Sequence, residues 1–63
     1  MTTRQLIKSG KLTEIESVNY NRRWLRCDGK IIVERHVGST MGYFLEGDDS
    51  RYVRCIADAY YEL

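Results

Sequence analysis

The dipeptide Asp28-Gly29 most constrains how this chain can fold, because it joins two runs of β-forming residues. Asp-Gly suits the two positive-φ positions of a type I′ turn. The sequence therefore predicts a β-hairpin with strands over residues 22–27 and 30–37. A turn of two residues also determines which residues of the two strands face each other.

Three of the residue pairs that the predicted register places opposite one another bear on the fold and on binding. These pairs are Arg23 with Glu34, Trp24 with Val33, and Arg22 with Arg35. The first joins opposite charges and the second joins an aromatic to a β-branched side chain, and both kinds of pair stabilise a sheet. The third sets two positive charges together, which is unfavourable unless an anionic group lies beside them.

Two further elements are expected before the hairpin. The stretch TTRQLIKSG predicts a short helix capped by Thr2 or Thr3. Residues 11–20 predict a strand, although their apolar residues recur every three positions and not every two. This spacing indicates either a β-bulge near Glu16–Ser17 or an irregular segment.

The C-terminal third contains another β-forming run, Met41–Glu46, followed by an amphipathic pattern. Apolar residues at three- and four-residue spacing come after Asp48, Asp49 and Ser50, which are good helix N-cap residues. A C-terminal helix is therefore expected. Residues 51–57 are also rich in β-forming side chains, so a strand there is the alternative.

Together these elements predict an α+β fold in one small domain over residues 1–63. It comprises a three-stranded antiparallel sheet, a C-terminal helix packed on the face with Leu25, Cys27 and Ile32, and a short N-terminal helix. The alternative is a small all-β barrel. The chain has 63 residues, 43% hydrophobic and 30% charged, which is typical of a globular domain near the lower size limit for folding alone.

The two cysteines, Cys27 and Cys55, form no CxxC pair and are too sparse for a secreted disulfide scaffold. The chain begins with no signal-peptide pattern, and no apolar run approaches the ~20 residues that a bilayer requires. We therefore expect a cytoplasmic protein that does not enter the membrane, with both thiols reduced and buried.

No residue pattern predicts catalysis. His36 is the only histidine, and the predicted hairpin separates it from Cys27 by roughly 20 Å, too far for a nucleophile–base pair. A pair of His36 with Cys55 stays geometrically open, but no pattern in the sequence favours it. The cysteines and the histidine lack the spacing of zinc ligands, and the glycines form neither a P-loop nor a dinucleotide-binding motif. We expect no enzymatic activity, no metal and no cofactor.

The stretch NYNRRWLRCDGK carries the strongest functional signal, because it places the only Trp among three arginines. Alternate side chains of a strand share a face, and Trp, Tyr and Arg dominate the strongest contacts of protein interfaces. The predicted partner-binding residues are Arg22, Trp24, Arg26, Arg35, Tyr20 and Tyr61. The alternative is that Trp24 fills the core while its arginine neighbours extend to the rim.

The distribution of charge separates two classes of function. Residues 1–38 carry eight basic and four acidic residues (+4), and residues 39–63 carry two basic and five acidic residues (−3). Nucleic-acid-binding domains usually have a strong basic surface, which the acidic C-terminal third offsets here. We therefore expect a non-enzymatic protein-binding module. The alternative is a small nucleic-acid-binding regulator that uses the same hairpin. A homodimer is a further alternative, since a chain with a basic and an acidic part can attract a second copy of itself.

In its size, its lack of catalytic motifs and its Arg- and Tyr-rich composition, the chain resembles small accessory proteins of phages and mobile elements. The resemblance implies an inhibitor or adaptor of a host protein complex.

Overall fold

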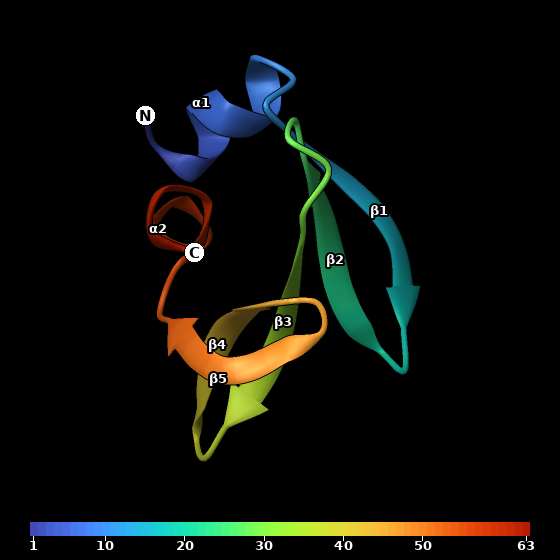
Figure 1. Ribbon diagram of the computed structural model, residues 1–63, viewed down its shortest axis with the longest axis vertical. Helices are drawn as coiled ribbons and strands as arrows, with labels where there is room; N and C mark the ends of the chain where they lie inside the picture. Colours follow the sequence, from blue (N-terminus) through green and yellow to red (C-terminus); the bar gives the residue numbers. More distant parts are fainter.

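The computed structural model describes residues 1–63 (Figure 1). Its helices and strands, in chain order, are α1 Thr3–Lys8, β1 Leu12–Val18, β2 Asn21–Arg26, β3 Ile31–Val37, β4 Thr40–Leu45, β5 Asp48–Val53 and α2 Ile56–Glu62. The five strands form one antiparallel sheet in which each strand pairs with its neighbours in sequence.

The predicted three-stranded sheet is wrong, because β1 and β5 extend the sheet to five strands. The alternative of a closed barrel is wrong as well. Closure would require hydrogen bonds between the first and last strands, and β1 and β5 do not pair. The sheet is curved but open, and both helices lie on the same side of it (Figure 1).

The β1–β2 hairpin turns at Asn19 and Tyr20, whose φ angles are 54° and 66°. Val18 pairs with Asn21, so these two residues form the whole turn, and positive φ at both is type I′ geometry. The register shifts between Ile15 and Val18, which confirms the predicted β-bulge. The bulge keeps these two residues on one face, since their partners in β2 are two residues apart.

The β2–β3 register differs from the predicted one by a single residue. Trp24 pairs with Ile32, and Arg23 pairs with Val33. The predicted pairs of Trp24 with Val33 and of Arg23 with Glu34 are therefore wrong. A slip of one residue exchanges the set of β3 side chains that share a face with Trp24.

The cause is the loop, which contains three residues, 27–29, where two were expected. The amide of Gly29 donates to the carbonyl of Arg26 (3.0 Å), and the amide of Arg26 donates to the carbonyl of Lys30 (2.7 Å). Gly29 has a φ angle of 92°, whereas Asp28 has no positive φ, the pattern of a type I turn followed by a left-handed glycine. The Asp28 carboxylate instead accepts a hydrogen bond from the Lys30 amide (3.1 Å).

The C-terminal third divides between a strand and a helix. β5 ends at Val53, and α2 begins only at Ile56, with Cys55 as an N-cap that makes no side-chain hydrogen bond. The predicted N-cap among residues 48–50 is therefore wrong, since those residues belong to β5. The alternative, a strand over residues 51–57, is right only as far as Val53.

The predicted N-terminal helix is confirmed as α1. Its N-cap is Thr2, whose hydroxyl accepts a hydrogen bond from the Gln5 amide (3.2 Å). The Gln5 side chain accepts one from the Thr2 amide in return (2.8 Å), which completes a capping box. With six and seven residues, α1 and α2 are both too short to span a bilayer.

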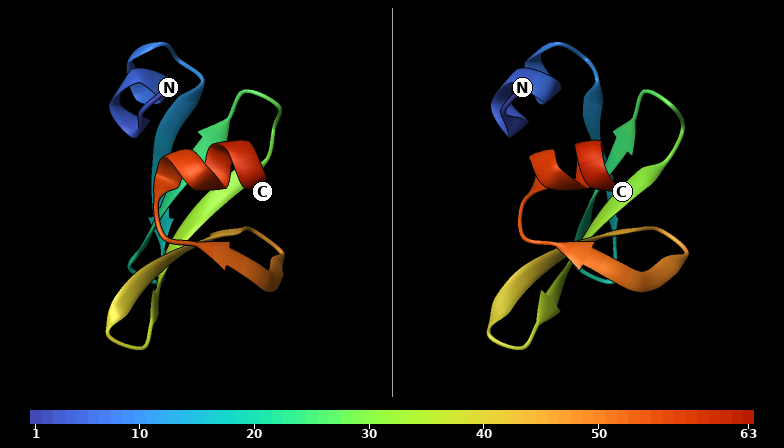
Figure 2. Two further views of the ribbon diagram at one scale, coloured as in Figure 1. Left: turned by 90° about the vertical axis from the view of Figure 1, so that its left-hand side faces the viewer. Right: turned by 60° about the vertical axis from the view of Figure 1, so that its left-hand side comes forward.

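The core lies between the helices and one face of the sheet, which we call the covered face (Figure 2). Its fully buried residues are Leu6, Leu12, Trp24, Ile32 and Ala59. Trp24 is only 1% exposed, so the alternative in which it fills the core is confirmed. The prediction that Leu25 packs on the C-terminal helix is wrong, since Leu25 is exposed on the other face of the sheet, and Cys27 is exposed apart from a contact with Tyr60 of α2 (3.7 Å).

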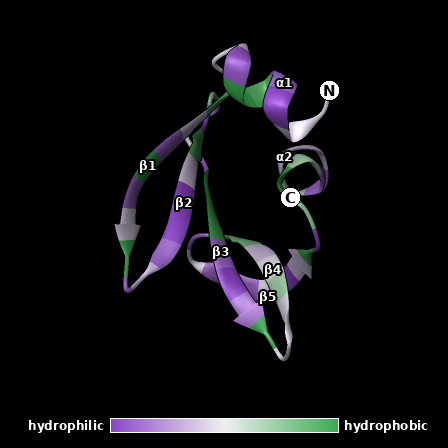
Figure 3. Cartoon of the chain, turned by 180° about the vertical axis from the view of Figure 1, so that it is seen from behind, coloured by the Kyte–Doolittle hydropathy of each residue, from purple (hydrophilic) through white to green (hydrophobic).

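β3 shows how the core is limited to one end of the sheet. Along its length the strand changes from hydrophobic at Ile31–Val33 to hydrophilic at Glu34–His36 (Figure 3). Ile32, in the first part, enters the core. The second part leads to the β3–β4 turn, which lies at the end of the molecule away from the helices (Figure 2).

Cys27 and Cys55 are free, as predicted, but both are exposed, so the expectation of buried thiols is wrong. Both should therefore react with a thiol reagent in the native protein. Titration with Ellman's reagent is expected to count two thiols with and without denaturant. A native count of zero, rising to two only on denaturation, would contradict the exposure of these side chains.

Candidate functional site

The six residues predicted to bind a partner do not form one surface. Arg22, Trp24 and Arg26 share the covered face, whereas Arg35 pairs with Gly42 and lies on the opposite face. Tyr20 is at the β1–β2 turn, and Tyr61 is on α2. The Tyr61 hydroxyl accepts a hydrogen bond from the N-terminal amine of Met1 (2.8 Å).

Trp24 is enclosed by other parts of the protein, so the prediction of an exposed Trp24 face is wrong. The guanidinium carbon of Arg22 lies 4.9 Å from the centroid of its ring, and the ring of Tyr43 lies 6.0 Å away. A partner could reach the indole only if the helices moved away from the sheet.

Arg22 is neutralised by an acidic neighbour on β1. Its Nε and Nη2 atoms donate to the two carboxylate oxygens of Glu14, each at 2.9 Å. This bidentate contact lowers the pKa of Glu14 and raises that of Arg22, to which the nearby charge of Glu34 also contributes. The predicted like-charge pair of Arg22 with Arg35 does not exist, because Arg35 lies on the other face.

Arg26 connects the β2–β3 loop to α2. Its Nη2 atom donates to Asp28 (2.8 Å) and its Nη1 atom to the carbonyl of Ala59 (3.4 Å), while its guanidinium carbon lies 5.4 Å from the ring centroid of Tyr60. The side chain is only 12% exposed. Arg26 is therefore a structural residue and does not extend to a contact surface.

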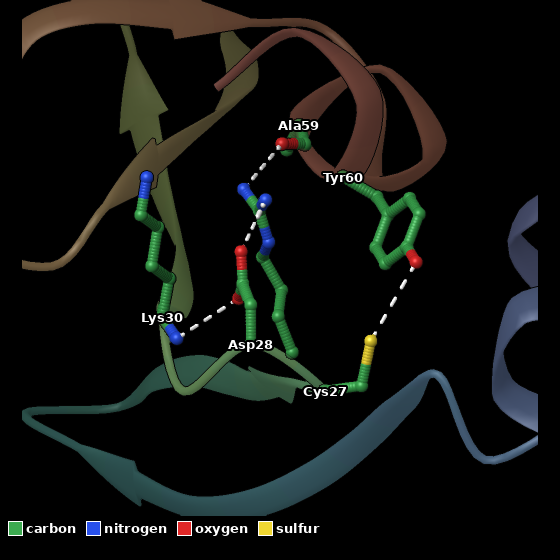
Figure 4. Close-up of polar contacts among 6 residues, drawn as sticks. Cys27, Asp28, Lys30, Ala59 and Tyr60 are labelled. Carbon is green, nitrogen blue, oxygen red and sulfur yellow. Dashed lines mark hydrogen bonds and ion pairs between the residues drawn. The ribbon is translucent and has the colours of Figure 1, made fainter.

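The loop residues beside Arg26 strengthen the same connection (Figure 4). The thiol of Cys27 and the hydroxyl of Tyr60 lie 3.7 Å apart, and this contact is the main cause of the raised pKa of Tyr60. The pKa of Asp28 is lowered chiefly by the hydrogen bond from the Lys30 amide and then by the charge of Arg26. These contacts hold the loop against α2.

The opposite face of the sheet, which we call the open face, is covered by neither helix. Strand alternation places on it Ile15, Val18, Asn21, Arg23, Leu25, Ile31, Val33, Arg35 and Phe44. Val18 and Leu25 are exposed, whereas Phe44 is buried under the guanidinium of Arg35 (4.1 Å to the ring centroid) and beside Tyr52 (5.3 Å). Sheet faces with this much apolar surface usually pack against another layer.

A cleft of about 180 Å³ lies on the open face, between the β1–β2 hairpin and the β4–β5 turn. Its apolar lining includes Val18, Val33 and Phe44, and Asn19 and Asn21 contribute polar groups at one end. Small-molecule sites usually measure roughly 300–1,000 Å³. The cleft therefore suits a single side chain of a partner better than a small-molecule ligand.

Two ion pairs form the charged wall of this cleft. Arg23 donates from Nε and Nη2 to Glu46 (2.7 and 3.1 Å), and Arg35 contacts Asp49 (3.1 Å). The arginine side chains are 16% and 38% exposed, whereas the side chains of Glu46 and Asp49 are 45% and 73% exposed. The carboxylates are therefore the more accessible charges. No group of three or more His, Cys, Asp or Glu is arranged to hold a metal ion.

Tyr20 stands at the tip of the β1–β2 turn, next to the cleft residues Asn19 and Asn21, and its side chain is fully exposed. Its left-handed backbone costs roughly 1–2 kcal/mol for a residue other than glycine. The type I′ turn requires this conformation, for which glycine is the usual residue, and the tyrosine instead presents an aromatic ring at the tip of the hairpin. Tyr20 is thus the predicted site residue that the structure places best for contact.

The open-face residues Arg23, Val33, Glu46 and Asp49 were missed from the sequence. Alternation along β2 does separate Arg23 from Trp24, but only the correct register places it beside Val33. The contacts of Glu46 and Asp49 come from a distant turn, and no local pattern indicates them.

No family model, curated protein or solved structure matches the chain significantly. Its function is therefore inferred from its own fold and surface.

Proposed function

We propose that the protein is a non-enzymatic protein-binding module that contacts its partner through the open face and the β1–β2 turn. The observation that carries this proposal is the uncovered, half-apolar sheet face. Both helices pack on the other side, and Val18 and Leu25 stay exposed on this one. Burying apolar surface of this kind is the main driving force of protein association. The fully exposed, strained Tyr20 supplies an aromatic contact at its edge.

The ion pairs favour a protein partner over nucleic acid. Four of the ten basic residues are paired with carboxylates, including Arg22, Arg26 and Arg35, which were the predicted contact arginines. Affinity for nucleic acid comes largely from free cations that neutralise phosphates. The paired arginines therefore leave less of this attraction than the sequence alone indicates.

A cytoplasmic location belongs to the same proposal. Two exposed free thiols are compatible with a reducing compartment, where thiols stay unpaired.

Substitution at the β1–β2 turn tests the proposal. Tyr20→Gly is expected to stabilise the fold by roughly 1 kcal/mol, because glycine adopts the left-handed conformation without strain. The same change removes the exposed ring and should weaken partner binding by about thirtyfold, the scale of a hot-spot residue. Thermal melts measure the first effect. Capture of a partner from native lysate, with a binding titration of the captured protein, measures the second.

The matched control is Tyr61→Ala, which removes another exposed aromatic ring, from α2 and away from the open face. It should bind as wild type does. If Tyr20→Gly and an open-face variant, Val18→Lys, both bind at wild-type strength, the contact surface lies elsewhere and the proposal is wrong. Capture that disappears after nuclease treatment would support the nucleic-acid alternative.

A further inference from the structure

We infer that the open-face cleft receives one basic side chain, a lysine or an arginine, from an extended segment of the partner protein. The inference rests on the proposed function and adds the chemistry of the partner. It follows from the free hydrogen-bonding capacity of the two carboxylates, from their greater exposure compared with the two arginines, and from the apolar lining of the cleft.

Both carboxylates of the cleft keep free hydrogen-bonding capacity although each is paired with an arginine. Arg23 already uses its Nε, Nη1 and Nη2 atoms, which donate to Glu46 and to the carbonyl of Glu16 (3.2 Å). Each carboxylate can accept about four hydrogen bonds. Glu46 accepts two from Arg23, and Asp49 contacts Arg35 through one oxygen, so both retain capacity. An occupant that brings donors can therefore bind without breaking either ion pair.

The exposure of the charged side chains also favours a cation. The carboxylates of Glu46 and Asp49 are more exposed than the guanidiniums of Arg23 and Arg35. A cation that approaches the cleft meets the carboxylates first, whereas an anion meets the like charges of Glu46 and Asp49 before it reaches either guanidinium. Placing a like charge in contact costs binding energy, so this arrangement also discriminates against acidic segments.

The apolar lining fits the rest of a basic side chain. Lysine and arginine have long aliphatic stems that pack on apolar surface while the charged end stays among polar groups. Val18, Val33 and Phe44 supply such a surface beside the carboxylates. The volume of about 180 Å³ is below the range of small-molecule sites, roughly 300–1,000 Å³, which favours one side chain as the occupant.

The edges of the sheet make the open face the more accessible route for a partner segment. β1 carries a bulge and two glutamates, and β5 pairs irregularly with β4 and begins with two aspartates. Bulges and charged residues at an edge strand hinder the addition of another strand. We therefore expect the partner segment to lie across the open face and not to extend the sheet.

A titration of the full chain, followed by amide NMR, tests the inference. The probes are two capped octapeptides, one alternating lysine with threonine and the other alternating glutamate with threonine. The lysine peptide is expected to cause saturable shifts at the amides of Asn19, Val33, Gly47 and Asp49, and the glutamate peptide is not. Asp49→Asn should weaken the lysine peptide by up to about fivefold, the scale of one exposed ion pair.

The matched control is Asp58→Asn, which removes one exposed carboxylate from α2 and should leave the affinity unchanged. Glu46→Gln is the second cleft variant, in case Asp49→Asn disturbs the β4–β5 turn. Equal binding of both peptides, shifts spread over the acidic surface, or no saturable binding would overturn the inference. Concentration-dependent shifts at the same amides without peptide would overturn it in favour of a second copy of this chain.

The experiments distinguish a failure of this inference from a failure of the proposed function. If Tyr20→Gly abolishes partner capture while the lysine peptide does not bind, the cation inference is wrong and the binding module stands. If the lysine peptide binds in the cleft while capture is insensitive to Tyr20 and Val18, the proposed function is wrong and the cleft chemistry stands.

Discussion

Replacing Trp24 with alanine is expected to leave the protein largely unfolded at 25 °C. Trp24 packs with Leu6, Leu12, Ile32 and Ala59 and is the largest of the fully buried side chains. Truncating a core Trp costs about 3–5 kcal/mol, because it removes buried apolar surface and leaves a cavity. The core of a chain this small supplies a net stability of only about 3–5 kcal/mol. Far-UV circular dichroism and urea denaturation measure the loss directly.

Tyr20→Ala is the control, since it removes another large aromatic that is fully exposed. Its effect on the free energy of unfolding should stay within about 0.5 kcal/mol, as for most surface substitutions. A cooperative Trp24→Ala melt near the wild-type melting temperature would show that Trp24 is not part of the core. The interpretation of the Trp24 face as an exposed contact surface would then be supported.

A strand over residues 11–20 was expected, but its pairing with the hairpin was not, because the β1–β2 turn contains no glycine. Hairpin turns with two positive-φ residues usually contain glycine, and here they are Asn19 and Tyr20. The β-bulge, by contrast, was predictable, because the three-residue spacing of Leu12, Ile15 and Val18 requires a shift of phase to keep Ile15 and Val18 on one face.

The register depended on a distinction that local sequence does not make. Asp-Gly is compatible with a two-residue type I′ turn and with a three-residue loop that ends in a left-handed glycine. Contacts from outside the hairpin accompany the second form. The Cys27 amide donates to the carbonyl of Lys11 (3.0 Å), and Arg26 donates to the carbonyl of Ala59 on α2 (3.4 Å).

The error in register also led to the wrong candidate site. Alternation correctly placed Trp24 with its neighbouring arginines on one face, but which face the helices cover depends on distant residues such as Leu6 and Ala59. The like-charge pair that supported the predicted site existed only in the wrong register. Glu46 joins Arg23 across 23 positions of the chain, a contact that propensity and spacing do not reveal.

Arg26→Glu is expected to destabilise the fold by about 2–4 kcal/mol, whereas strand alternation predicts an exposed residue that tolerates the change. The substitution puts a carboxylate in a nearly buried position beside Asp28 and removes the donor to the Ala59 carbonyl. Breaking a buried ion pair costs about 3–5 kcal/mol, and the partial exposure of Asp28 reduces this figure.

Arg35→Glu is the matched control, because it reverses the same charge at a more exposed arginine that is also paired with one carboxylate. Its cost should stay near or below about 1 kcal/mol, the range of surface ion pairs. Arg26→Met, which keeps an unbranched apolar stem, should be milder than Arg26→Glu, because it buries no new charge. Urea denaturation of the three variants ranks them. If Arg26→Glu and Arg35→Glu cost equally little, Arg26 is a rim residue, and the covered side of the β2–β3 hairpin again becomes a candidate contact surface.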